Sequence, residues 1–376
     1  MSPRQAVAAD TTSASREDGS GRDAERPTAG RLLIYGANGF VGQEASRAAR
    51  ARVWEPVLAG RNADEVVKLA REQDLEARVF SLEDGPSVRE GLSGVTVVLN
   101  MAGPFQHTYR PLVEACLDVG AHYVDITGEM DVLIGIEDYD ADARERGVML
   151  LPAAGLDSVP ADCLAAYLHR RLPTATRLRL AVQTTGPAGL PPGTLKTMIS
   201  LAHLPDRVIE NGEPVEASGS AAGTVDFGEG PVATVRYQAA DTLVASRTTG
   251  IGDVEAYVAL PLLTRAAYLG ARTLRTLLRP PFVRSILGRL ASGGSTEEQR
   301  RQSRTVVWAE AKDDAGGRAA ARLHGPEGAV VWTVSMALDV VGRALSGRAV
   351  PGLQTPAGAF GPDLALETPG VTREDA

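Results

Sequence analysis

The sequence predicts an α/β fold, in which a doubly wound parallel sheet is joined to a second α+β domain with a mostly antiparallel sheet. Two observations predict the first part. Short apolar segments alternate with helical segments from residue 31 to about 155, and a glycine-spaced turn follows the first of them. Beyond residue 160 the pattern changes to strand-like alternation and a hairpin, which predicts the second part.

Apolar runs, turn residues and spacing assign the elements of the first domain. The run 95–103 is continuous and β-branched, as expected for a strand covered on both faces. Pro111 near the start and Gly120 at the end bound one helix. We expect strands at 31–35, 54–60, 77–80, 95–103, 122–128 and 148–155, and helices at 40–52, 63–73, 86–92, 110–120 and 138–147.

The second domain is assigned in the same way. The segment 305–325 centres on the turn "DDAGG" and is typical of a hairpin. We also expect a strand at 177–186, a Gly-Pro loop and helix at 191–204, strand-like alternation at 230–249, a strand at 254–260 and a helix at 329–347.

Composition limits the possible functions. The 376 residues carry a net charge of −8, which argues against a general nucleic-acid binder. Cys116 and Cys163 are expected to be small buried hydrophobes in helices, and the five histidines show no metal-ligand spacing. No apolar run is long enough for a membrane span, so we expect a cytoplasmic protein. Residues 1–30 and 368–376 are polar and are predicted to be disordered tails.

The turn "YGANGFVG" at 35–42 suits a phosphate-binding loop. Gly36 allows the sharp turn after the strand, Gly39 lets the backbone approach a pyrophosphate, and Gly42 lets the helix pack on the strand. The spacing is G-x-x-G-x-x-G, which alone also fits a turn without a ligand. A strand before it, a helix after it and a second strand at the right distance favour a dinucleotide.

The end of the second strand indicates which dinucleotide is bound. An NAD site usually has an acidic residue there, whereas this strand ends in Gly60, Arg61 and Asn62, and Glu55 lies at its other end. A guanidinium can pair with a 2′-phosphate through several donors, although Arg61 could also be a solvated loop residue. We therefore predict NADP(H).

Two further strand ends should complete the cofactor site, because ligands of doubly wound sheets lie across the carboxyl ends of the strands. These ends are "LNMAGPF" and "YVDITGE", and "PAAGLDSVPAD" follows the last strand at the crossing into the second domain. Capping or turn roles are the alternative for each polar residue. The predicted cofactor-binding residues are Gly36, Ala37, Asn38, Gly39, Phe40, Val41, Gly42, Gly60, Arg61, Asn62, Asn100, Ala102, Gly103, Pro104, Asp125, Thr127 and Gly128.

These motifs, with "PPGTLKTM" and "TPAGAFG" after them, occur in an order that resembles the stand-alone bacterial branch of the saccharopine dehydrogenase-like superfamily, which includes mycobacterial trans-acting enoyl reductases. The resemblance covers roughly residues 31–366. It implies a Rossmann domain, a second domain inserted after the sixth strand, and a C-terminal segment that packs back on the first. On this basis we expect an NADP-binding domain at 31–160, a substrate and dimerisation domain at 161–348 and a return segment at 349–367.

The candidates for proton transfer are His107, Tyr109, Asp157 and Lys196. Tyr35 and Tyr109 have no lysine four residues on, so the Tyr-x-x-x-Lys pair of short-chain dehydrogenases is not formed by them. A C=C or C=N acceptor needs only positioning, a dry site and one proton source. His107 and Lys196 could equally be solvated residues, and Lys196 could instead bind a carboxylate or phosphate of the substrate.

The segment 256–290 contains six arginines interleaved with leucines, and it contains no carboxylate. It suits either a docked helix pair with a solvated cationic face or a contact with an acidic carrier protein, a CoA-like phosphate or a membrane surface.

Three functions remain open at this stage. The first is an NADPH-dependent reductase of an enoyl-type C=C in lipid or polyketide assembly. The second is an NADPH-dependent imine reductase or amino-acid-type dehydrogenase of specialised metabolism. The third is a non-catalytic NADP(H)-binding protein that docks on a membrane or carrier. In each case we expect a homodimer and no metal.

Overall fold

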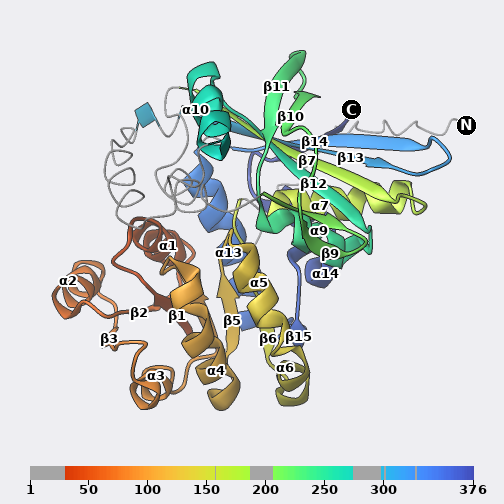
Figure 1. Cartoon of the computed structure of the whole chain (residues 1–376). Helices are drawn as coiled ribbons and strands as arrows, with labels where there is room; N and C mark the ends of the chain where they lie inside the picture. Colours follow the sequence, from red (N-terminus) through yellow and green to blue (C-terminus); the bar gives the residue numbers. More distant parts are fainter. Residues whose placement is uncertain (1–29, 157, 187–205, 274–297, 300–301, 327) are drawn as a thin grey trace, which may run out of the picture.

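The computed structural model describes residues 30–156, 158–186, 206–273, 298–299, 302–326 and 328–376. Two sheets, each covered by helices, lie next to each other in the molecule (Figure 1). Asp157 and Lys196 lie outside the described residues, as does most of the arginine-rich segment after residue 273.

The first sheet is parallel throughout and confirms the doubly wound fold. Its strand order is β15-β6-β5-β4-β1-β2-β3. The order runs outward in both directions from the boundary between β1 and β4, which is the switch point where such sheets bind ligands. The strands are β1 (Leu32–Tyr35), β2 (Val57–Gly60), β3 (Ala77–Val79), β4 (Val97–Asn100), β5 (His122–Asp125), β6 (Met149–Leu151) and β15 (Gly352–Leu353).

Helices cover both faces of this sheet, as the buried apolar runs require. One face packs against α1 (Phe40–Ala51), α2 (Ala63–Gln73) and α13 (Ala329–Leu345). The other packs against α3 (Gly85–Gly91), α4 (Tyr109–Val119) and α6 (Asp140–Arg146). A helix that the sequence analysis did not anticipate, α5 (Met130–Glu137), lies beside α4 and also contacts the second domain.

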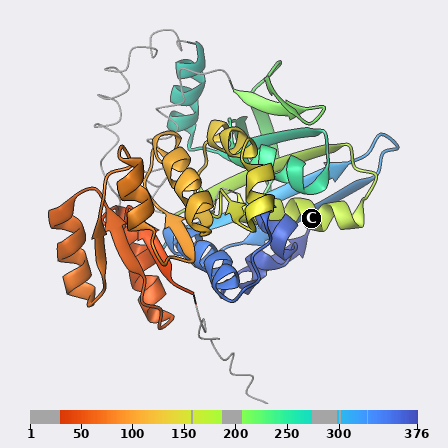
Figure 2. The same cartoon turned by 90° about the horizontal axis from the view of Figure 1, so that it is seen from below.

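Helix α13 has the expected helical conformation but packs on the first sheet, against β4, β5 and α1. It was expected within the second domain. Asp339 of α13 forms an ion pair with Arg52 at 2.7 Å, and Gly342 leaves room for the Trp54 ring. Figure 2 shows this helix and the C-terminal segment against the first domain, so residues far apart in sequence complete one core.

The second sheet is mostly antiparallel, as predicted. Its order is β10-β11-β12-β7-β13-β14-β16, with β8 beside β12 and β9 beside β8. Helices α7 (Val159–Arg171) and α9 (Ala240–Thr249) pack on it. The strands are β7 (Arg177–Thr185), β8 (Arg207–Glu210), β9 (Glu213–Glu216), β10 (Ala222–Asp226), β11 (Pro231–Arg236), β12 (Asp253–Ala259), β13 (Arg304–Lys312), β14 (Arg318–His324) and β16 (Thr372–Asp375).

Two predictions about local structure were wrong. Residues 240–249 form helix α9 rather than a strand, because α9 is buried around most of its circumference and so shows no helical periodicity in sequence. The segment 368–376 is not a disordered tail, since β16 pairs with β14. Arg322 of β14 holds Glu374 at 2.8 Å, and Tyr167 donates a hydrogen bond to Asp375 at 3.0 Å.

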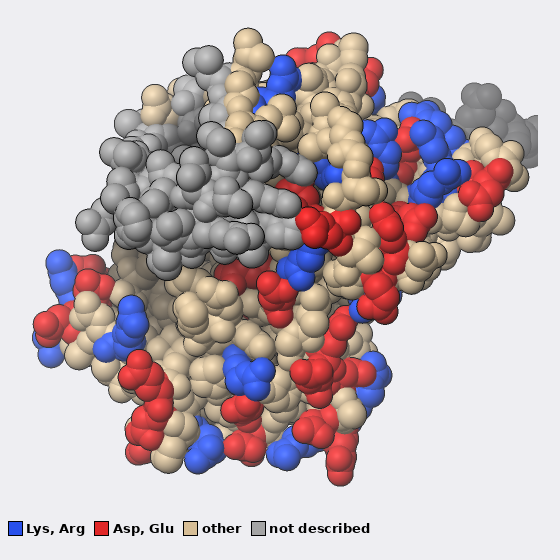
Figure 3. All heavy atoms as spheres, in the orientation of Figure 1, with Lys and Arg blue, Asp and Glu red and all other residues tan. Residues whose placement is uncertain are grey.

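The remaining described elements are α10 (Leu262–Thr273), α14 (Pro356–Phe360) and the short 3₁₀ helices η1 (Phe105–His107) and η3 (Leu364–Glu367). Both cysteines are buried, as expected, and burial raises the pKa of both thiols. Within the described part of the chain, no helix combines the length and apolar character needed to cross a bilayer. On the face seen in Figure 3, acidic and basic side chains are interspersed over the described surface.

Candidate functional site

The glycine loop after β1 is packed so tightly that side chains would not fit. Gly36 has a φ of +79°, and a Cβ added there would lie 2.8 Å from the Ala102 Cβ of the neighbouring strand end. A Cβ on Gly42 would lie less than 3.0 Å from the Gly36 carbonyl oxygen and 2.9 Å from Ala37 Cα. The Gly36 amide donates to the Ala59 carbonyl at 2.8 Å, which fixes the turn against β2.

Helix α1 begins directly at this loop. Gly39 is its N-cap residue, and no side chain caps the helix. The hydrogen bonding of α1 begins with the Gln43 amide, which donates to the Gly39 carbonyl at 2.9 Å. The positive end of the helix dipole therefore faces the carboxyl edge of the sheet, and this arrangement fits the pyrophosphate of a dinucleotide.

The end of β2 places Arg61 beside this loop. Its side chain is exposed and makes no hydrogen bond or ion pair with the described residues. Burial raises the pKa of Tyr35 to about 12, and the positive charge of Arg61 partly opposes that shift. Asn62 does not face the loop, because it caps α2 by accepting the Glu65 amide at 3.4 Å. Arg61 thus has free donors for a phosphate.

The end of β4 is organised by the buried side chain of Asn100. Its amide donates to Thr108 Oγ1 and to Tyr123 Oη, both at 3.1 Å, and its carbonyl oxygen accepts the Ala102 amide at 3.0 Å. These bonds use the Asn100 side chain within the protein. They support the turn at Gly103 and Pro104, which are both exposed.

The end of β5 is likewise held by hydrogen bonds within the protein, which the side chain of Asp125 accepts. Its side chain is fully buried and accepts three hydrogen bonds, from Tyr123 Oη at 2.8 Å and from the Thr127 and Ala153 amides, each at 2.9 Å. Burial raises the pKa of Asp125 to about 6 against the opposing effect of these donors. The carboxylate therefore joins the ends of β5 and β6 and positions Thr127 and Gly128.

Glu129 connects the two strand ends to each other. Its carboxylate accepts the Phe105 amide at 2.8 Å and the Gln106 amide at 3.0 Å, and its own amide donates to Thr127 Oγ1 at 3.1 Å. Glu129 is the last residue of the motif "YVDITGE" and was not among the predicted site residues. A carboxylate just past a strand end could have indicated this role in the sequence, because such a carboxylate can accept hydrogen bonds from backbone amides of the neighbouring turn.

The two described proton-transfer candidates, His107 and Tyr109, differ in their exposure to solvent. His107 is exposed at the end of η1, on the turn that Glu129 holds, with its Nε2 3.3 Å from Gln106 Nε2. Tyr109 is buried, and a Cβ on Gly135 of α5 would collide with its hydroxyl oxygen. This packing does not support a role for Tyr109 as proton donor. For Asp157 and Lys196, which lie outside the described residues, the structure gives no position.

A second buried carboxylate joins the return segment to the second domain. Asp162 of α7 is fully buried and accepts the Ala357 amide of α14 at 2.7 Å. Its Oδ1 has no hydrogen-bond partner within the described structure. Burial raises the pKa of Asp162 to about 7, although interactions with the Thr248 hydroxyl and the Ala357 amide oppose the shift.

Substituting Asp162→Asn is expected to stabilise the protein at alkaline pH. Above pH 7 the buried carboxylate of Asp162 is charged, and this charge destabilises the folded protein. Because the pKa of Asp162 is raised in the folded protein, the free energy of unfolding increases as the pH falls from about 7 towards 4. Asparagine removes that charge, so the free energy of unfolding should rise by roughly 1–3 kcal/mol at pH 8 and by less at pH 5. Urea denaturation at both pH values measures this difference.

The control for this prediction is Asp142→Asn, which removes one carboxylate from the exposed side of α6. It should leave the pH dependence of unfolding as in wild type. A stabilisation by Asp162→Asn that is equal at pH 5 and pH 8 would contradict the assigned cause.

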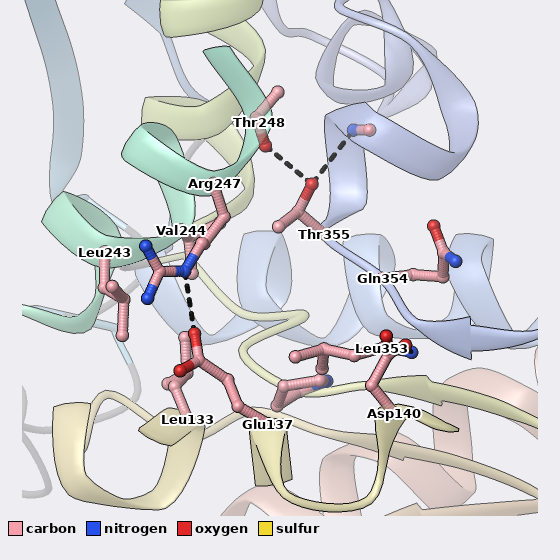
Figure 4. Close-up of a pocket in the computed structure, with 12 residues that line it drawn as sticks. Leu133, Glu137, Asp140, Leu243, Val244, Arg247, Thr248, Leu353, Gln354 and Thr355 are labelled. Atoms are coloured by element: carbon pink, nitrogen blue, oxygen red, sulfur yellow. Dashed lines mark hydrogen bonds and ion pairs between the residues drawn. The ribbon is translucent and has the colours of Figure 1, made fainter. Parts of the chain in front are cut away.

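A cavity of about 390 Å³ lies between α5, α9 and the segment from β15 to α14. Figure 4 shows Leu133, Leu243 and Val244 on its apolar side and the Arg247–Glu137 ion pair, 2.7 Å long, across it. Thr248 and Thr355 hydrogen-bond to each other at 2.6 Å on its other side. Pro152 and Gln354, which follow β6 and β15 at the carboxyl edge of the first sheet, also line it.

Comparisons with known proteins agree with this geometry. Residues 32–151 match the family described as the saccharopine dehydrogenase NADP binding domain. The human saccharopine dehydrogenase-like oxidoreductase is 28% identical over 193 residues, covering 45% of each protein. A trans-acting enoyl reductase of Mycobacterium ulcerans is 32% identical over 153 residues, covering 37% of this chain and 35% of that protein. Both alignments span less than half of the relative's length.

The whole fold is also shared with a solved structure. Apo saccharopine dehydrogenase (L-Glu forming) from Saccharomyces cerevisiae superimposes with a TM-score of 0.62 and 13% identity, covering 93% of this chain and 100% of the yeast chain. At this identity the similarity establishes the two-domain architecture alone. The family match confirms the predicted NADP-binding domain. Residues 32–151 therefore match a saccharopine dehydrogenase NADP-binding domain, and over part of its length the chain is similar to saccharopine dehydrogenase-like oxidoreductases.

Proposed function

We propose that this protein is an NADPH-dependent reductase that transfers a hydride to an activated double bond, of which an enoyl-type C=C is the best-supported acceptor. The observation that carries the proposal is the combination of an NADP-binding sheet edge with an apolar-walled cavity at the neighbouring ends of β6 and β15. The similarity to a trans-acting enoyl reductase over 153 residues supports the choice of acceptor.

The residues at the sheet edge divide into distinct roles in this proposal. The amides at the start of α1 would hold the pyrophosphate, Arg61 would hold the 2′-phosphate, and the backbone at 102–104 would leave room for the nicotinamide. NADPH supplies the hydride when bound. His107, exposed on the turn fixed by Glu129, is the described candidate for donating the proton that completes the reduction.

The cavity is proposed to receive the apolar part of the acceptor. In the strand order, β6 and β15 lie one and two strands beyond β5, which places their ends about 5 and 10 Å from the end of β5. Leu133, Leu243 and Val244 give this space an apolar wall. This wall would accept an apolar group, and the Arg247–Glu137 ion pair would lie beside the polar end of the acceptor.

A C=N acceptor is the second candidate. The fold covers the entire yeast saccharopine dehydrogenase chain, which favours an imine reductase or amino-acid-type oxidoreductase. NADPH oxidation measured with an enoyl thioester and with a cyclic imine separates the two. Turnover of neither, with intact NADPH binding, would favour the third function, a non-catalytic protein that docks through residues 256–290.

Substituting Arg61→Ala is expected to weaken NADPH binding by about 10- to 100-fold and to leave NADH binding within about twofold, because a guanidinium–phosphate contact is charge-assisted. Titration of each cofactor by fluorescence measures both constants. Arg47→Ala, which removes an exposed arginine of α1 that pairs with Glu44, is the matched control. Equal affinity of the wild type for NADH and NADPH would refute the cofactor assignment.

We also propose that the chain acts as a cytoplasmic homodimer, with a cofactor domain at 31–160 that is completed by α13 and by a return segment at 349–367, and with a substrate and dimerisation domain in the remainder of 161–348. Light scattering coupled to size exclusion tests the dimer. A monomer at micromolar concentration would contradict it.

A further inference from the structure

The glycine loop is tied to helix α2 by one side-chain contact. Asn38, in the middle of the loop, donates from Nδ2 to Oε2 of Glu65 at 2.5 Å. The main chain of Asn38 is also held, because its carbonyl oxygen accepts Gln43 Nε2 at 2.9 Å. The contact with Glu65 therefore fixes the direction of the Asn38 side chain, with a carboxylate next to it.

Glu65 makes this contact in place of an ordinary helix-capping role. It is the third residue of α2, and its amide donates to the N-cap residue Asn62. In a capping box, the carboxylate at this position would reach back to the N-cap amide. Here the carboxylate instead crosses to the glycine loop. A side chain directed away from its local helix partner and toward a ligand loop indicates a role at the loop.

The place of this contact is the end of β2. A Cβ added to Gly60 would lie 3.0 Å from Asn38 Oδ1 and 3.1 Å from the Val66 side chain, so the Asn38 side chain lies directly over the last residue of the strand. In dinucleotide-binding sheets, the adenosine ribose lies at the end of this strand, and an acidic residue there accepts hydrogen bonds from its hydroxyls. Glu65 supplies a carboxylate to this region from α2.

Two opposite charges therefore serve the same end of β2. Arg61, directly after the strand, is exposed with free donors, while Glu65 is exposed with its carboxylate on Asn38. A guanidinium favours a 2′-phosphate, whereas a carboxylate repels it and accepts hydrogen bonds from a 2′-hydroxyl. Glu65 lies five residues past Gly60, so the residues at the end of β2 give no sequence signal for it.

We propose that Glu65 is a cofactor-specificity residue, which, with Asn38, faces the ribose oxygens of the adenosine and reduces the preference for NADPH over NADH that Arg61 creates. This inference rests on the proposed nicotinamide cofactor site. With Glu65 present, the wild type should prefer NADPH over NADH less strongly than Arg61 alone would cause. The charge of Glu65, rather than its hydrogen bond to Asn38, carries the effect.

The test is the variant Glu65→Gln in the full-length chain. Its amide oxygen still accepts from Asn38, so the loop keeps its hydrogen bond while the charge is lost. We expect NADPH to bind about fivefold more tightly and NADH to bind about equally or up to about threefold more weakly, since the repulsion is removed and one strong acceptor is weakened. Binding of both cofactors is measured by titration.

Asp64→Asn is the matched control, because Asp64 lies in the same first turn of α2, is exposed and carries the same charge. It should change the NADPH-to-NADH affinity ratio by less than about twofold. A Glu65→Gln ratio no larger than that of the control would overturn the inference. Wild-type protein that binds neither cofactor would instead refute the proposed cofactor site, so the two failures are distinguishable.

Discussion

Gly42→Ala is expected to abolish measurable NADPH binding and to lower the free energy of unfolding by about 3 kcal/mol, because the new methyl group has no space. Its Cβ would lie less than 3.0 Å from the Gly36 carbonyl oxygen and 2.9 Å from Ala37 Cα. Both are backbone atoms of the turn, so relief requires the loop itself to move away from α1. The better helix propensity of alanine, about 1 kcal/mol, is too small to offset this. NADPH titration and urea denaturation measure the two effects.

The control is Gly270→Ala. Gly270 also lies within a helix, α10, but a Cβ there would meet none of the described atoms within 4 Å. This variant should be neutral or slightly stabilising and should leave NADPH binding unchanged. If Gly42→Ala bound NADPH as tightly as Gly270→Ala, the loop would not be the pyrophosphate site.

Asp125→Ala is expected to lower the free energy of unfolding by about 3–5 kcal/mol, which is enough to unfold many proteins at 37 °C. The substitution leaves three buried donors, the Tyr123 hydroxyl and the Thr127 and Ala153 amides, without an acceptor. These donors belong to β5 and to the turns after β5 and β6, so the carboxyl edge of the sheet should loosen as a unit. Hydrogen exchange of the amides around Thr127 and Ala153 measures this local effect.

Asp125→Asn distinguishes lost hydrogen bonds from lost charge. An asparagine carbonyl oxygen can still accept both backbone amides, which in the native protein share Oδ1, so this variant should lose at most about half of the stability lost by Asp125→Ala. Equal losses in the two variants would show that the negative charge, and not the acceptor geometry, holds the strand ends.

The order of strands and helices in the first domain could be predicted from sequence because each strand there is a short apolar run bounded by turn residues. Helix α5 was missed, although Gly128 separates it from β5, since its eight residues are mostly apolar and are buried on more than one side, which gives no clear helical period. Helix α9 was missed for a different reason. Its polar residues Asp241, Thr242 and Ser246 are buried together with its apolar ones, so no amphipathic period exists in the sequence.

The site was predictable where the chemistry depends on backbone geometry. Gly36 and Gly42 lie at positions where a side chain would collide with the backbone or with Ala102, and their spacing between a strand and a helix had indicated such a turn. The polar residues of the strand ends were less predictable in role. Asn100 and Asp125 were expected to contact the cofactor, whereas their side chains hydrogen-bond within the protein. Such partners come from strands that are distant in sequence, so no local pattern distinguishes a support residue from a ligand residue.

The position of α13 has a consequence for synthesis of the chain. A nascent chain that has emerged up to β6 contains six strands of the first sheet, but the helix that covers β4 and β5 on one face, and the edge strand β15, are encoded about 180 and 200 residues later. Apolar side chains such as Leu99 and Val124 on that face stay uncovered until then. The cofactor domain should therefore become protease-resistant only after residue 353 has left the ribosome, even though most of its sequence is made first.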